Sequence, residues 1–385
     1  MAQAMTVAAV QLDGAPAPTA ERLARAQGQI AQSANAGAQL VVLPELFNIG
    51  STYHETNYDV TERADGHTMQ WLQAQARAHN LHIAGSFLLV DDEDTYNSAF
   101  IVAPDGRNWR YDKLYPYLWE RVYYRDGRGI TVAETDIGRI GLMIGWDAGH
   151  SDLWRRYAGR VDVLLVLNDL QDISEAALAF PTTDQPDVYV HDLGLLISWA
   201  ADDSSDYLGH DLRQQVEWIN VPVVCAGASG EFRSRLPSPF FSVSFATLFR
   251  PDLWAVVDQH HAQTELVAPF AHNTRIIAAN GQTLAQVESA GDAHAIATLT
   301  LPDLQAMPHA DDPPRMSTPA LAYPLVDVVG AAIYTLNYRR NVRRYWGARM
   351  APIEATTYRW LGIAMIMTVV GAILGQLFPR RRRDD

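Results

Sequence analysis

Short apolar runs rich in Val, Ile and Leu recur along residues 5–301, and stretches with helical spacing separate several of them. Runs of this length and composition predict buried β-strands, and apolar positions three to four apart predict helices. Strands alternating with helices, together with hairpin-type turns, predict a mixed α/β sandwich. We expect strands at 5–12, 40–43, 82–91, 98–103, 137–144, 161–167, 222–226, 274–278 and 295–301, helices at 20–36, 68–79 and 152–158, and turns at Pro104–Gly106 and Ala279–Gly281.

Two stretches, about 169–212 and 231–272, interrupt this alternation and are predicted insertions in a domain covering residues 1–302. The second contains an aromatic run from Pro239 to Phe249 followed by Trp254. It is expected either to pack on its own domain or to form a lid or a partner surface. Four prolines mark residues 303–319 as the exit from the domain.

The C-terminal end contains an uncharged apolar stretch of 19 residues, Trp360–Phe378. At 1.5 Å per residue such a helix spans about 28 Å, close to the roughly 30 Å hydrocarbon core of a bilayer. The alternative is a buried core helix, but only a basic tail at 379–385 follows. We therefore predict one transmembrane helix at 360–378, preceded by a linker at 303–359 that includes an amphipathic or docking segment.

Charge and cysteine content narrow the classes of protein further. The net charge is −14, yet residues 311–385 carry 11 basic and 6 acidic side chains, which is +5. The acidic part repels nucleic acid, and the basic end suits anionic lipid. A single cysteine, Cys225, suits a reducing compartment, and the start of the chain reads as a strand rather than a signal peptide. These features favour a membrane protein whose soluble domain is cytoplasmic.

One acid and one lysine carry the candidate chemistry. Glu45 ends the apolar run that begins at Leu40, and Lys113 is the only lysine in the chain. Attack on an amide or nitrile carbon needs a nucleophile, a base that takes and returns its proton, and a positive charge for the developing oxyanion. Glu45 and Lys113 supply two of these three types. The plainer interpretations are a leftover surface lysine, or a buried ion pair that persists because removing one partner would strand a charge.

At these residues the chain resembles the nitrilase superfamily of carbon–nitrogen hydrolases. The resemblance covers about residues 5–301 and implies the α-β-β-α sandwich of that superfamily and pairing of two sandwiches into a homodimer. The sequence has no phosphate loop, dinucleotide fingerprint or metal-ligand spacing of His with Cys or carboxylates, so no metal or nucleotide cofactor is implied. The motifs that carry it are Val7–Leu12, Leu43-Pro-Glu45, Tyr111-Asp-Lys113-Leu, Gly138–Asp147, Val221–Val224 with Gly230, and Thr274–Gly281.

By this resemblance, Glu45 matches the general base and Lys113 the lysine that stabilises the transition state. Glu120 falls near the second glutamate of the family, and Trp146 and Asp147 match the aromatic-Asp pair beside the substrate pocket. The family places its cysteine nucleophile directly before that pair, where this chain has Gly145. Cys225 lies on another predicted strand, in a context typical of a small buried hydrophobe.

Three functions remain open from the sequence. The leading one is a membrane-anchored protein with impaired catalysis that acts as a binding or scaffold subunit of a membrane assembly with a membrane-protein partner. The second is an active hydrolase or acyltransferase with a nucleophile of another kind, such as Cys225 or Ser151. The third is a ligand sensor whose pocket binds small amides or acids.

Overall fold

The computed structural model describes residues 3–92, 94–194, 207–301, 306–317 and 323–346. The predicted membrane helix at 360–378 and the tail at 379–385 lie outside the described residues. Contacts divide the chain into two units, Met1–Tyr338 and Arg339–Asp385, and the fold belongs to the first. Within the part of the chain that the structure describes, no helix is both long enough and apolar enough to cross a bilayer.

The first sheet is built outward from the N-terminal strand, whose side chains alternate between its two faces. Met5, Val7 and Ala9 point into the core between the sheets, whereas Val10 and Leu12 face the covering helices. Its strands run in the order β5 (Asn108–Asp112), β4 (Asp94–Val102), β3 (His82–Asp91), β2 (Leu40–Val42), β1 (Gln3–Asp13) and β16 (Ala293–Leu301).

The second sheet joins the first where β1 pairs with β11 near Gln11 and Gly227. Its strands β7, β8 and β11 run parallel and are buried on both faces, which explains their unbroken apolar runs. The order is β6 (Val132–Thr135), β7 (Gly138–Ile144), β8 (Val163–Leu167), β11 (Val223–Ser229), β14 (Arg275–Ile277) and β15 (Thr283–Gln286).

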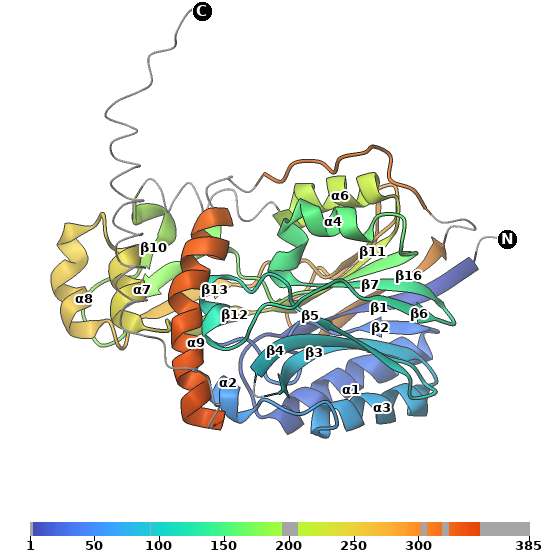
Figure 1. Cartoon of the computed structure of the whole chain (residues 1–385), viewed down its shortest axis with the longest axis horizontal. Helices are drawn as coiled ribbons and strands as arrows, with labels where there is room; N and C mark the ends of the chain where they lie inside the picture. The colour runs from blue at the N-terminus through green and yellow to red at the C-terminus, as the bar shows by residue number, and fades with distance from the viewer. Residues whose placement is uncertain (1–2, 93, 195–206, 302–305, 318–322, 347–385) are drawn as a thin grey trace, which may run out of the picture. The chain divides into compact units, whose positions relative to one another are not determined.

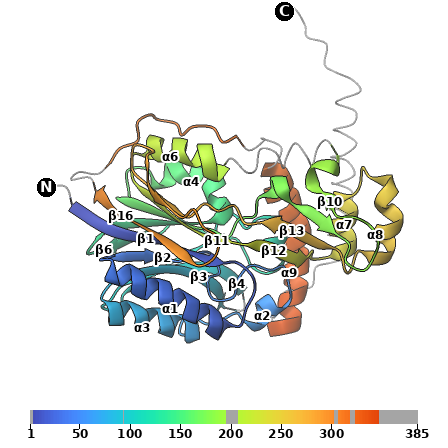
Figure 2. The same ribbon diagram turned by 180° about the vertical axis from the view of Figure 1, so that it is seen from behind.

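Helices cover the outer face of each sheet, as Figures 1 and 2 show from opposite sides. Helices α1 (Thr19–Asn35) and α3 (His67–His79) pack their apolar faces, which include Leu23 and Leu72, on the first sheet. Helices α4 (Ser151–Tyr157) and α6 (Leu212–Ile219) pack Trp154 and Trp218 on the second. The order helix, sheet, sheet, helix confirms the predicted sandwich.

The two predicted insertions combine in one smaller sheet of four strands. The first insertion contributes β9 (Ala177–Ala179) and β10 (Val188–Tyr189), and the second contributes β12 (Glu231–Arg235) and β13 (Glu265–Pro269). Because β9 pairs with β13, the insertions stabilise each other. Helices α7 (Pro239–Ala246) and α8 (Trp254–His260) connect β12 to β13.

The remaining described elements are short turns of helix and the final helix. The first compact unit extends to Tyr338, well beyond the expected domain end at 302, because the proline-rich stretch lies against α6. There Gln215 Nε2 donates to Pro314 O at 2.7 Å, and Trp218 Nε1 donates to Ala310 O at 2.8 Å. These elements are α2 (Thr56–Asp59), η1 (Leu118–Val122), η2 (Gly145–Gly149), η3 (Ile173–Glu175), η4 (Val190–Asp192), η5 (Tyr207–Asp211), η6 (Pro251–Leu253), η7 (Pro324–Gly330) and α9 (Ala331–Trp346).

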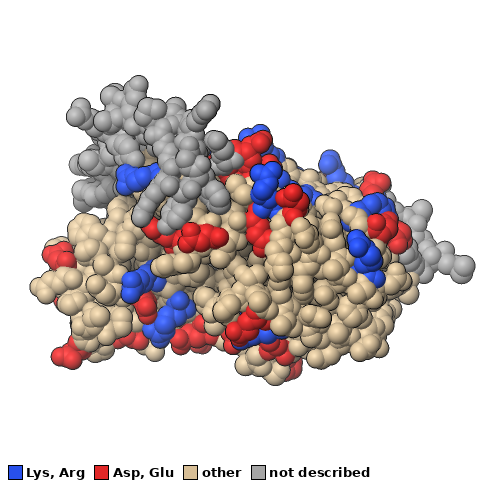
Figure 3. All heavy atoms as spheres, turned by 90° about the horizontal axis from the view of Figure 1, so that it is seen from below, with Lys and Arg blue, Asp and Glu red and all other residues tan. Residues whose placement is uncertain are grey.

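Charged side chains are scattered over the surface. On the face drawn in Figure 3, acidic and basic side chains of the described residues are interspersed. That face therefore has no area of a single sign like those that bind a phosphate backbone.

Candidate functional site

The candidate site forms where the ends of strands from both sheets converge. Glu45 follows β2, Lys113 follows β5 and Gly145 follows β7. Lys113 Nζ lies 2.8 Å from Glu45 Oε1, and both side chains are fully buried. A Cβ atom on Gly145 would lie 2.6 Å from Glu45 Oε2 and 3.0 Å from Lys113 Nζ. The three positions singled out in the sequence therefore meet at one point.

Gly145 occupies a turn that suits glycine. Its φ of +50° lies in the left-handed region, where side chains are disfavoured. The carboxylate of Asp147 fixes this turn: it accepts hydrogen bonds from Ile144 N at 3.0 Å, from Tyr115 N at 2.8 Å and from the Tyr111 hydroxyl at 2.7 Å. The end of β7 is thereby held with the backbone of Gly145 against Glu45 and Lys113.

Glu120 joins the same ion network from η1. Its Oε2 lies 2.8 Å from Lys113 Nζ and accepts a hydrogen bond from Tyr117 N at 2.6 Å. Burial alone would lower the pKa of Lys113, but the charges of Glu120 and Glu45 raise it above its ordinary value. Lys113 is therefore a permanent cation held between two carboxylates.

The structure adds three residues that the sequence did not single out. Asn97 Nδ2 donates to Glu45 Oε1 at 2.7 Å. Asp169 follows β8, and its carboxylate accepts a hydrogen bond from the Ser51 hydroxyl. An acid at the end of an apolar strand is the signal that pointed to Glu45, so Asp169 carried a similar one. Asn97 lies within β4 and carried no such signal.

The site holds more carboxylates than cations. One oxygen each from Glu45, Glu120 and Asp169 lies within 4.8 Å of the others, a spacing with which carboxylates can hold a metal ion. Lys113 already provides a positive charge among them. Burial raises the pKa of Glu45 well above its ordinary value, and the nearby charge of Asp169 raises it further. Burial raises the pKa of Asp169 as well, against the attraction of Lys113.

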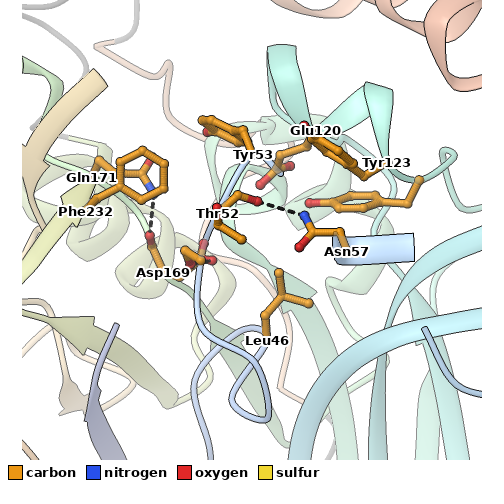
Figure 4. Close-up of a pocket in the computed structure, with 11 residues that line it drawn as sticks. Leu46, Thr52, Tyr53, Asn57, Glu120, Tyr123, Asp169, Gln171 and Phe232 are labelled. Carbon is orange, nitrogen blue, oxygen red and sulfur yellow. Dashed lines mark hydrogen bonds between the residues drawn. The ribbon is translucent and has the colours of Figure 1, made fainter. Parts of the chain in front are cut away.

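A small cavity lies beside this network. Its volume is about 20 Å³, which is room for about one water molecule. In Figure 4, Asn57 donates to Thr52 O at 2.8 Å, and Gln171 donates to Asp169 O at 2.9 Å. The cavity is lined by Leu46, Ser51, Thr52, Tyr53, Asn57, Glu120, Tyr123, Tyr124, Asp169, Gln171 and Phe232.

Of the three residues expected at the substrate pocket, only Glu120 lines this cavity. Asp147 is fully buried and holds the turn at Gly145 instead. Trp146 stacks on Tyr323, with ring centroids 5.7 Å apart, and its indole N–H donates to Asp327 Oδ1 at 3.3 Å. The structure thus places Trp146 and Asp147 at the turn that follows β7 rather than on the wall of this cavity.

The C-terminal segment covers this side of the site. Asp327, on η7, lies 2.9 Å from His150 Nε2, at the turn after Gly145, and 3.4 Å from Arg121 on η1. On α9, the Tyr334 hydroxyl accepts a hydrogen bond from Trp119 Nε1 at 3.0 Å. The segment around 323–338 therefore contacts both turns that carry Gly145 and Glu120.

The alternative nucleophiles lie apart from this network. Cys225 lies within β11, opposite Val166 and Arg275 in the neighbouring strands. Burial raises the pKa of its thiol to about 12, so the reactive thiolate is scarce at neutral pH. Ser151 begins α4, on the outer layer. The site therefore contains no thiol, because Cys225 is the only cysteine in the sequence.

Comparison with known sequences points to one family. Residues 6–184 match the carbon–nitrogen hydrolase family. A nitrilase from Pyrococcus abyssi is 32% identical over 146 residues, which are 37% of this chain and 55% of that protein. An omega-amidase from Bos taurus is 31% identical over 159 residues, 38% of this chain and 56% of its own length. The chain thus spans little more than half the length of these relatives.

Solved structures agree on the fold. An amidase from Nesterenkonia sp. superposes with a TM-score of 0.55 at 16% identity, covering 82% of this chain and 94% of the amidase. Nit3 from Saccharomyces cerevisiae, a nitrilase superfamily member, superposes with a TM-score of 0.54 at 17% identity, covering 77% of this chain and 90% of that one. Identities this low show a shared architecture rather than a shared activity.

Proposed function

We propose that this chain is a catalytically impaired relative of the carbon–nitrogen hydrolases, the family that residues 6–184 match, and that it acts as a binding or scaffold subunit. One observation carries the proposal. The position that faces both Glu45 and Lys113 is Gly145, which has no side chain to attack a substrate. Loss of the nucleophile from a cooperating set of catalytic groups leaves only a small residual activity.

The packing of the site supports the same proposal. The Glu45 carboxylate occupies the space that a side chain at 145 would enter. Lys113, whose charge would stabilise an oxyanion, already pairs with the carboxylates of Glu45 and Glu120. The adjoining cavity has room for about one water molecule, too little for an amide substrate without a rearrangement. These contacts favour a structural ion network over a substrate site.

Turnover tests this proposal directly. The purified full chain is assayed with a panel of amides and nitriles beside the Glu45→Gln variant, which removes the candidate base. We expect no difference between the two proteins above the uncatalysed rate. Hydrolysis by the natural chain that disappears in Glu45→Gln would refute impaired catalysis.

A cysteine placed at 145 tests the geometry. In the Gly145→Cys variant the added side chain would meet the Glu45 carboxylate, which lies 2.6 Å from the Cβ position. We expect labelling by iodoacetamide at neutral pH to be slower than that of a free cysteine, with Cys225 unlabelled in the natural chain as the control. Rapid labelling would contradict a filled structural site and show a thiol activated by the charge of Lys113.

A second candidate is an active hydrolase with a hydroxyl nucleophile. The Ser51 hydroxyl donates to the Asp169 carboxylate, and both residues line the cavity beside Glu120. Mass spectrometry after incubation with activated esters distinguishes the two functions. An acyl adduct on Ser51, absent in Ser51→Ala, would favour this candidate, and unmodified protein would favour the first.

Attachment to a membrane is the second part of the proposal. Its support is the sequence alone: 19 uncharged residues at 360–378 with arginines at 380–383. The motifs shared with the superfamily further suggest a homodimer, and the basic C-terminal end suggests a cytoplasmic domain. Resistance of the full chain to extraction from membranes by alkaline carbonate, lost on deletion of 360–385, is the expected result; release of the full chain would contradict it.

A further inference from the structure

The α7–α8 connection exposes an unusual concentration of large apolar side chains. Phe240, Phe245, Leu248, Phe249 and Trp254 are each between 50% and 56% exposed, and we call these five the aromatic patch. They make up more than half of the exposed large hydrophobic residues in the part of the chain that the structure describes. Concentrated exposure of this kind marks an interaction surface, whereas isolated exposed hydrophobic residues are ordinary.

Three side chains of the patch have contacts with neighbouring residues of the same insertion. Phe245 stacks on Phe241, with ring centroids 6.2 Å apart, and Phe240 meets the ring of His261 edge-on at 5.2 Å. The indole N–H of Trp254 donates to Thr247 O at 3.2 Å, which fixes the polar edge of that ring. These contacts leave one face of each of these rings exposed.

The polar side of α7 already has a partner. Ser242 is 2% exposed, and its hydroxyl lies 2.8 Å from the Tyr334 hydroxyl on α9. Ser238, just before α7, accepts a hydrogen bond from Asn337. α9 thus covers the side of α7 that carries Phe241 and Ser242, and Phe240 and Phe245 lie on the side left outward.

The course of the chain indicates what covers the patch. In the first unit, α9 rests on α7 and reaches Tyr338, and the uncharged stretch at 360–378 begins 22 positions later in the sequence (360 − 338). A linker of that length spans about 33 Å as a helix and roughly 75 Å when extended. A bilayer that holds residues 360–378 is therefore within reach of α7.

The chemistry of the patch suits lipid. Phe, Trp and Leu are the side chains that interfacial segments bury at the boundary between headgroups and acyl chains. Arg250 and Asp252 at its centre neutralise each other, with Nη2 and Oδ2 2.6 Å apart. Arg250 and Asp252 are the only charged residues between Pro239 and Trp254, and the exposed Asp258 follows one turn after Trp254 on α8.

We propose that the aromatic patch lies in the headgroup region of a phospholipid bilayer, so that the domain rests on the membrane surface. This inference rests on the proposed membrane attachment and extends it from the C-terminal segment to the folded domain. It gives α7 and α8 a role that is separate from the candidate site.

A site-directed spin label provides the test. Because Cys225 is fully buried with a raised thiol pKa, a cysteine at an exposed position can be labelled selectively. The full-length Phe249→Cys variant is labelled with a nitroxide and incorporated into phosphatidylcholine vesicles. The matched control is Leu284→Cys, on β15, which is 41% exposed and outside the patch. Relaxation by oxygen, which dissolves in lipid, is compared with relaxation by a polar nickel chelate.

We expect the ratio of oxygen to nickel-chelate relaxation to be several-fold higher at 249 than at 284. Equal ratios in protein that floats with the vesicles would overturn the patch proposal and leave the membrane attachment standing. Spin–spin broadening between two labels at 249 would also overturn it, by showing that a second copy covers the patch. Protein that does not float with vesicles would overturn the attachment and this inference together.

Discussion

Two regions of this molecule reverse the usual distribution of side chains. The network of Glu45, Lys113, Glu120 and Asp169 buries charge, whereas the aromatic patch on α7 and α8 exposes apolar rings. Lys113 pairs with Glu45 and Glu120 inside the domain, but the acids outnumber the lysine, and Glu45 Oε2 has no hydrogen-bond partner among the described residues. The exposed rings have polar partners only along their inner side. The comparison shows that Lys113 has its ionic partners inside the domain, whereas the apolar side chains of the patch face outward.

The largest expected effect comes from removing the cation of the buried network. Lys113→Met leaves three carboxylates buried without an ammonium, and we expect the free energy of unfolding to fall by about 3–5 kcal/mol. Chemical denaturation in detergent measures it. The matched control is Arg233→Met, since Arg233 also contacts two carboxylates but is 48% exposed. That change should cost less than about 1 kcal/mol. Equal losses in both variants would mean that Lys113 is not the centre of a buried network.

The next effect concerns the space beside Glu45. A methyl group in Gly145→Ala must displace the Glu45 carboxylate and adopt a left-handed φ, so we expect a loss of about 2–4 kcal/mol. Gly106→Ala is the control, because its φ is +95° but no atom lies within 4 Å of the added Cβ. It should lose only the backbone part, about 1–2 kcal/mol. A smaller loss at 145 than at 106 would show that the site has free space.

The excess of carboxylates predicts a dependence of stability on pH. Because the pKa values of Glu45 and Asp169 are raised in the fold, the folded chain binds more protons than the unfolded chain above about pH 4. Stability should therefore fall as pH rises from there through the raised pKa values, by up to about 1.4 kcal/mol per pH unit for each group. Asp169→Asn should flatten this slope.

Asp162 supplies the control for the sign of that effect. Although burial opposes it, hydrogen bonds from Arg139 lower the pKa of Asp162. Its contribution to stability is thus lost as pH falls, in the opposite direction. Denaturation midpoints measured across pH compare Asp169→Asn with Asp162→Asn. If stability depends on pH equally in Asp169→Asn and in the natural chain, then Asp169 does not cause this dependence.

The smallest expected effect completes the comparison. Phe245→Ser combined with Phe249→Ser alters half-exposed side chains, so the free energy of unfolding should change by no more than about 0.5 kcal/mol per site. Thermal unfolding in detergent measures it. A loss of several kcal/mol would mean that these rings stabilise the fold itself. The contrast between the buried charged network and the exposed aromatic patch would then fail.

Much of the candidate site was accessible from the sequence because its residues follow strands. Glu45 and Gly145 end strands that read as apolar runs, and the ends of parallel strands meet at one edge. Glu120 lies in an irregular turn, where spacing alone does not fix a position. Asn97 lies within β4, and its contact with Glu45 depends on how β4 and β2 are placed in the sheet. The cover formed by η7 and α9 is a contact across about 200 positions, which local pattern does not encode.

Local spacing and side-chain type predicted nine strands, the helices at 20–36, 68–79 and 152–158, a mixed α/β sandwich and the uncharged stretch at 360–378. They did not predict β5, β6, β15 or α6. Tertiary structure decided which distant residues meet. Asp169 lies beside Glu45 as a third acid, Trp146 and Asp147 lie at the turn after β7 rather than on the cavity wall, and the two insertions share one sheet. Those outcomes depend on contacts between residues far apart in the chain, whose energies exist only once the sheets have packed.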